Sequence, residues 1–159
     1  MSPPVFYAAA GLALLLLAIT VVPRLLLKRA QDRLATRLLE AEASGGGFRL
    51  LTRADLVTGE RRRLPGVLGL TADAVVFEGL FGEREVLATS AIVKIITGRR
   101  MSSGRTLVRR EVLRLGRSGG GELEVVLTPA SAGAWRSHLG LWAIEERKAS
   151  ADTVTPGRK

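Results

Sequence analysis

The chain has 159 residues, a formal net charge of +9 and no cysteine. This length provides room for one domain with appended segments, and the absence of cysteine excludes a disulfide framework and agrees with a reducing compartment. The positive charge favours an anionic partner, although part of it follows from a general abundance of arginine in a chain rich in Ala, Gly and Leu.

An uncharged apolar segment begins the chain. Residues 1–23 carry no charged side chain, and residues 5–22 read VFYAAAGLALLLLAITVV. As a helix this stretch extends roughly 27 Å, and with residues 25–27 it reaches the ~30 Å thickness of a bilayer core. The sequence therefore predicts a transmembrane anchor over residues 1–27, with residues 5–22 in contact with the lipid bilayer.

The charges that flank this segment predict its orientation. A cleaved signal peptide would have basic residues before the apolar run and a small-residue cleavage site after it. Here no such site is present, and the basic residues all follow the run: Arg24, Lys28, Arg29, Arg33 and Arg37. Because basic flanks stay on the cytoplasmic side, we expect a single-pass protein of the inner (plasma) membrane, with its N-terminus outside and the remainder in the cytosol.

Residues 28–46 predict an amphipathic juxtamembrane helix and a hinge. Pro23 is expected to interrupt the first helix. Beyond it, helical spacing continues, and one apolar stripe contains Leu27, Leu34, Leu38 and Ala41. This helix either lies on the inner leaflet or packs on the following domain. The sequence SGGG at 44–47 predicts its end and a flexible connection.

From Phe48 the apolar residues recur with the two-residue period of β-strands. Turn-forming sequences rich in Gly, Asp and Ser separate short segments of Val, Ile, Leu and Thr. With no helices between them, these segments predict an antiparallel meander. The predicted strands are residues 67–71, 74–79, 85–89, 91–98, 106–116 and 122–128, preceded by one strand within 48–63.

A final helix is predicted after Pro129, where SAGAWRSHLGLWAIEERK returns to helical spacing. Ser131 is its expected N-cap. Trp135, Leu139 and Trp142 fall at i, i+4 and i+7, which predicts one buried apolar stripe. The polar tail, residues 149–159, has little apolar surface to bury and is expected to be disordered.

Three segments of this chain form a recognisable pattern: GVLGLTADAVVFEG (66–79), LATSAIVKI (87–95) and AWRSHL (134–139). In their order and spacing they resemble the bacterial PH-like (pleckstrin-homology) and GRAM-like domains. The chain departs from the family pattern at Ala88 and Ala91, where Pro and Asp are frequent. The resemblance implies a mainly-β PH-like domain over residues 47–148, in which antiparallel strands form a split barrel closed by a C-terminal α-helix.

The residue inventory gives no indication of an enzyme. The chain has one histidine, His138, and its four aspartates lack metal-ligand spacing. The glycine-rich turns lack the flanking residues of phosphate-binding loops. We therefore expect no catalytic site, no metal site and no cofactor. Nucleic acid is not an expected partner either, because no helix has a basic face and no aromatic residues alternate with the arginines.

Two groups of arginines are the candidate contact residues. They are Arg61, Arg62 and Arg63 before one strand, and Arg99, Arg100 and Arg105 in one loop. Together with the resemblance, they predict a membrane-anchored, non-enzymatic interaction or scaffolding module. The alternative is an anionic phospholipid-binding module that docks through these basic loops, since guanidinium groups bind phosphate in a bidentate manner. A solvated basic rim without a specific ligand, and the oligomeric state, both stay open.

Overall fold

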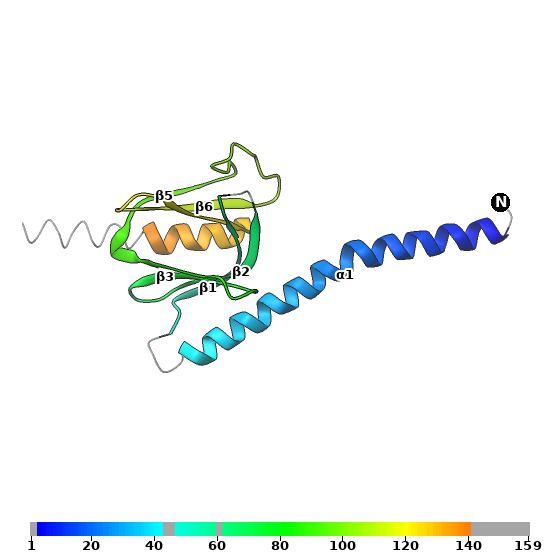
Figure 1. Cartoon of the computed structure of the whole chain (residues 1–159), viewed down its shortest axis with the longest axis horizontal. Helices are drawn as coiled ribbons and strands as arrows, with labels where there is room; N and C mark the ends of the chain where they lie inside the picture. The colour runs from blue at the N-terminus through cyan, green and yellow to red at the C-terminus, as the bar shows by residue number, and fades with distance from the viewer. Residues whose placement is uncertain (1–2, 43–46, 60–61, 141–159) are drawn as a thin grey trace, which may run out of the picture.

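The computed structural model describes residues 3–42, 47–59 and 62–140. One long helix, α1 (Pro3–Glu42), precedes a domain of strands, and residues 129–140 form a second helix (Figure 1). The strands are β1 (Leu50–Val57), β2 (Arg63–Leu70), β3 (Ala74–Gly79), β4 (Arg84–Ala88), β5 (Ile92–Gly98), β6 (Glu111–Arg117) and β7 (Glu122–Leu127), with a 3₁₀ turn η1 (Thr89–Ala91) between β4 and β5.

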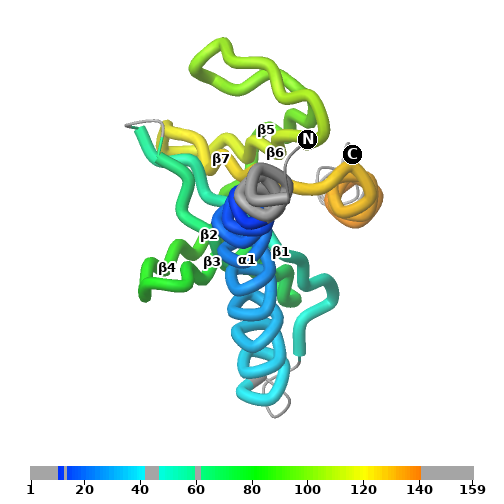
Figure 2. The backbone as a smooth tube through the Cα atoms, turned by 90° about the vertical axis from the view of Figure 1, so that its right-hand side faces the viewer, coloured from blue at the N-terminus to red at the C-terminus, as the bar shows by residue number. Residues whose placement is uncertain are grey.

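All seven strands pair antiparallel in the order β4-β3-β2-β1-β7-β6-β5. β1 pairs with β2 along its whole length, but with β7 only over Asp55–Val57. The sheet therefore divides at this junction into two halves, β1–β4 and β7–β5, that face each other. The helix of residues 129–140 lies beside both halves and closes the side between them (Figures 1 and 2).

The main core lies between the two halves and the closing helix. Alternate residues of the strands point into it, as the two-residue period predicts. Trp135 of the closing helix is fully buried in this core, and its indole Nε1 donates a hydrogen bond to Thr52 Oγ1 of β1 at 2.8 Å. Leu139, one turn later, is also buried. These two positions of the predicted apolar stripe are confirmed, whereas Trp142 and residues 141–159 lie outside the described part of the chain.

Three sequence predictions within the domain are wrong. The strand expected over 67–71 already begins at Arg63, so Arg63 lies in β2 and not before a strand. The strand expected over 106–116 begins only at Glu111, because residues 99–110 form a long loop that covers the outer face of the second half. Met101 and Leu107 of this loop are buried there with Val112 and Val126. The N-cap of the closing helix is Thr128, not Ser131. Thr128 Oγ1 accepts the backbone N–H of Ser131 at 3.2 Å, which satisfies one of the free amides of the first turn.

The first helix is continuous and docks on the domain. It passes through Pro23, so the expected interruption there does not occur; a proline removes one backbone hydrogen bond and can bend a helix without ending it. In its C-terminal half, Gln31 is buried and its Nε2 donates to the carbonyl oxygens of Gly66, at 3.0 Å, and Ala54, at 3.4 Å. Of the two expected positions for residues 28–42, the structure thus shows packing on the domain.

The earlier part of α1 exposes its large apolar side chains. These are Leu12, Leu14, Leu15, Leu16, Leu17, Ile19, Val21, Val22, Leu25, Leu26 and Leu27. Within the described part of the chain, however, no helix combines the length and the apolar character needed to cross a membrane. The structure therefore gives no support for the transmembrane span predicted over residues 5–22. The side chains of residues 3–10 and 13, and the predicted hinge at 44–46, lie outside the description.

Candidate functional site

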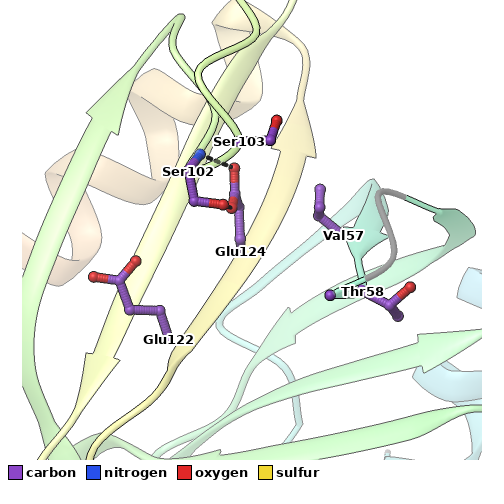
Figure 3. A pocket seen from close by; sticks show the side chains of 7 residues that line it. Val57, Thr58, Ser102, Ser103, Glu122 and Glu124 are labelled. Atoms are coloured by element: carbon purple, nitrogen blue, oxygen red, sulfur yellow. Dashed lines mark hydrogen bonds between the residues drawn. The ribbon is translucent and has the colours of Figure 1, made fainter.

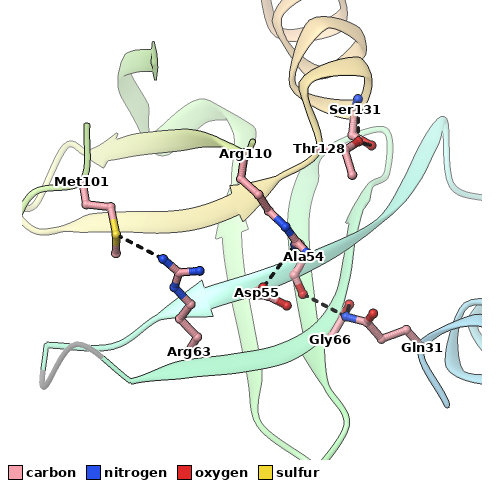
Figure 4. Close-up of polar contacts among 9 residues, drawn as sticks. All are labelled: Gln31, Ala54, Asp55, Arg63, Gly66, Met101, Arg110, Thr128 and Ser131. Atoms are coloured by element: carbon pink, nitrogen blue, oxygen red, sulfur yellow. Dashed lines mark hydrogen bonds and ion pairs between the residues drawn. The ribbon is translucent and has the colours of Figure 1, made fainter. Parts of the chain in front are cut away.

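The structure places the two predicted arginine groups at the same end of the domain. Arg62 and Arg63 are exposed where β2 begins, and Arg99, Arg100 and Arg105 are exposed in the loop of residues 99–110; Arg61 lies outside the described residues. The two segments meet where the Arg63 guanidinium lies 3.7 Å from Met101 Sδ (Figure 4). The N-terminal half of α1 extends beyond this same end of the domain (Figure 1).

A buried carboxylate attaches the loop to the sheet. Glu124 of β7 is only 5% exposed, and its carboxylate accepts hydrogen bonds from the Ser102 backbone N–H, at 3.0 Å, and from the Ser102 hydroxyl (Figure 3). Beside this contact is an open polar cavity of about 440 Å³, lined by Val57, Thr58, Gly59, Ser102, Ser103, Glu122 and Glu124. Because Glu124 alternates with core residues along β7, its position in the sequence indicates only an outward-facing polar residue.

A further basic site lies between α1 and the sheet, where the sequence had not indicated one. We call it the α1 groove: a cavity of about 440 Å³ lined by Arg24, Leu27, Lys28, Gln31, Arg53, Asp55, Arg110 and Thr128. It contains four cationic side chains and one carboxylate, and none of them belongs to the predicted arginine groups. Only one signal for it exists in the sequence, namely that Arg24 and Lys28 stand one helical turn apart.

Asp55 connects the α1 groove with the arginine at the start of β2. Its carboxylate forms an ion pair with Arg110 at 3.2 Å, and its side chain is 17% exposed (Figure 4). Burial raises the pKa of Asp55 above its ordinary value, and the positive charges of Arg110 and Arg63 partly oppose this rise. Asp55 therefore pairs directly with Arg110, and the charge of Arg63 lies near enough to favour its ionised form.

The described arginine groups and cavities are built from ion pairs and hydrogen bonds. His138 is exposed on the closing helix. In residues 3–42, 47–59 and 62–140, no three His, Cys, Asp or Glu side chains are grouped where they could hold a metal ion. The expectation that the chain is not an enzyme and binds no cofactor stays a prediction.

Comparisons with known proteins agree on the fold alone. No protein-family model matches the sequence, and no curated protein matches it. Among solved structures, the C-terminal domain of an unknown protein from Leishmania infantum is similar, with a TM-score of 0.52 and 12% identity over 68% of this chain and 94% of that chain. A structure of Vav1 with an allosteric inhibitor has a TM-score of 0.43 and 13% identity over 69% of this chain and 33% of that chain, too low a similarity for any inference.

The architecture is nevertheless plain from the strands themselves. Seven antiparallel strands in two facing halves, followed by a helix that closes the open side, fit the PH-like fold that the three sequence segments imply. The predicted mainly-β domain with a C-terminal closing helix is thus confirmed as an architecture.

Proposed function

We propose that this chain is a non-enzymatic, membrane-associated interaction module of a bacterial cell, which holds a PH-like domain at the cytosolic face of the membrane. The observation that carries the proposal is the exposed apolar surface of α1 between Leu12 and Leu27. No described part of the domain covers these side chains. Exposure of so large an apolar surface to water is unfavourable in free energy. Lipid acyl chains are the covering that fits a helix exposed on all sides.

The contact between α1 and the domain supports a fixed position of the domain. Gln31 bonds to two neighbouring strands, and the Asp32 carboxylate forms an ion pair with Arg53 of β1. A module held in this way presents the same surfaces to its surroundings whenever α1 is in the membrane.

The outer edge of β4 supports a protein partner. β4 is the last strand of its half in the described sheet. Val86 on this strand is 54% exposed, and Phe81 in the preceding turn is 76% exposed. An unpaired strand edge beside exposed apolar residues favours addition of a partner's extended segment.

Docking on anionic phospholipid is the second candidate function. It is favoured by the common location of Arg62, Arg63 and the loop of residues 99–110, at the end of the domain beyond which α1 extends. Anionic lipids of the cytosolic leaflet attract each nearby basic residue by about 1 kcal/mol. Both candidates require that the domain lies on the cytosolic side.

Because the chain has no cysteine, single-cysteine variants can show on which side of the membrane the domain lies. In intact bacterial cells that express full-length S118C, a membrane-impermeant maleimide should not react, because Ser118 is exposed in the turn between β6 and β7 and the domain lies in the cytosol. After permeabilisation the same variant should be labelled. S2C, the matched variant, should be labelled in intact cells if the N-terminus lies outside.

Labelling of S118C in intact cells would contradict the proposed location. Protection of both cysteines in intact cells would keep the domain in the cytosol and exclude an external N-terminus, which leaves α1 on the cytosolic leaflet.

A further inference from the structure

The α1 groove contains cationic side chains that can bind a further anion. Arg24 and Lys28 are exposed on α1, and neither has a hydrogen-bond or ion-pair partner among the described residues. On the opposite wall, Arg53 and Arg110 are partly exposed, with side-chain exposures of 41% and 48%. Each of these two arginines is held by one carboxylate, so its guanidinium retains further donors for a ligand.

The closing helix adds to the positive potential of the groove. Thr128, which lines the groove, is the N-cap of residues 129–140, so the positive end of this helix lies at the groove wall. The one carboxylate in the lining, Asp55, is already paired with Arg110. The groove is therefore arranged for an anion.

The position of the groove indicates where this anion comes from. Leu25, Leu26 and Leu27 are the last residues of the exposed apolar surface of α1, and Arg24 and Lys28 stand on the same stretch of helix. When acyl chains cover the apolar surface, the headgroup region of the bilayer begins at these residues. Long basic side chains at such a boundary reach toward the phosphates of the lipids.

We infer that the α1 groove binds the phosphate of an anionic phospholipid headgroup. This inference rests on the proposed membrane association of α1. Guanidinium groups match the oxygen geometry of a phosphate, and a volume of about 440 Å³ lies within the usual range for small ligands. The bound headgroup bridges α1 and β1, so it fixes the domain against the membrane in one orientation.

The test uses the full-length chain reconstituted in phosphatidylcholine nanodiscs that contain a small fraction of spin-labelled phosphatidylglycerol or spin-labelled phosphatidylcholine. The motionally restricted fraction of each label gives the selectivity of the protein for the anionic lipid. For the variant Arg24→Gln/Lys28→Gln we expect this selectivity to fall by about tenfold or more, since each basic residue near the headgroups contributes about 1 kcal/mol.

A matched control removes the same charge from the same helix. Arg33 and Arg37 line a separate small cavity next to Leu80 and take no part in the α1 groove. Arg33 and Arg37 also stand five and nine residues farther along α1 than Lys28, which is about a Debye length or more from the headgroups. Arg33→Gln/Arg37→Gln should therefore leave the selectivity within about twofold of the wild type. Circular dichroism of each variant checks that the exposed substitutions leave the fold unchanged.

Three results would overturn the inference. Equal losses in the two double variants would show a general effect of charge, and unchanged selectivity in Arg24→Gln/Lys28→Gln would show that the α1 groove is empty. If inorganic phosphate abolished the selectivity at millimolar concentration, the groove would be a site for free phosphate and not for a lipid. A chain that fails to enter nanodiscs at all would instead contradict the proposed membrane association, on which the inference depends.

Discussion

Trp135→Ala should lower the free energy of unfolding of the domain by about 3–5 kcal/mol, the range for removal of a large buried aromatic side chain. Trp135 is fully buried where the closing helix meets both halves of the sheet. The substitution leaves a cavity there and also removes the hydrogen bond to Thr52 Oγ1. The measurement is urea unfolding of the full-length chain in detergent, followed by circular dichroism of the strands.

His138→Ala on the same helix is the control, because His138 is exposed. Its effect should be within about 0.5 kcal/mol, as is usual for surface positions. A loss below about 1 kcal/mol for Trp135→Ala would mean that the closing helix contributes little to the core.

Gly66→Ala should destabilise the domain by about 2–3 kcal/mol, because the added methyl group has no space. A Cβ at this position in β2 would lie 2.6 Å from Phe77 Cζ and 2.9 Å from the Gly79 Cα, and it would also meet the Glu78 carbonyl oxygen. Two of these neighbours are backbone atoms of the paired strand β3, which cannot move without disturbing the strand pairing.

Gly98→Ala is the matched substitution in another strand. A Cβ at Gly98 in β5 would meet no atom within 4 Å. The change should therefore be neutral or slightly stabilising, within about 1 kcal/mol, since alanine restricts the unfolded chain. Equal effects of the two substitutions, measured by the same urea unfolding, would contradict the close approach of β2 and β3.

Most strands and the turns between them could be predicted from the sequence because local signals agree there, whereas the pairing of β1 with β7 joins distant segments and has no local signal. The strand over 74–79 was predicted with its observed bounds, since the turn residues at 71–73 precede a clear run of Val and Phe. The loop of residues 99–110 misled the same reasoning. Leu107 has the apolar character of a strand residue, but it is buried in a second small cluster on the outer face of the sheet.

The α1 groove could not be predicted, because its charges come from separate parts of the chain. Arg24, Arg53 and Arg110 are brought together only when α1 packs on β1. That packing includes Leu34 and Leu38 of the expected apolar stripe, which are partly buried, but it also buries Gln31, a polar residue outside the stripe. The buried amide of Gln31 is satisfied because it donates to two backbone carbonyl groups. The sequence holds no signal for such a pairing.

Membrane fractionation with an alkaline carbonate wash tests the central claim most directly. The wild-type chain, expressed at low level in bacterial cells, should stay in the membrane pellet through both high salt and carbonate, because acyl chains cover the exposed apolar surface of α1. A variant in which Leu14, Leu15, Leu16 and Leu17 are all replaced by Ser should move largely to the supernatant. Recovery of the wild-type chain in the soluble fraction, or equal partition of the two proteins, would contradict the account.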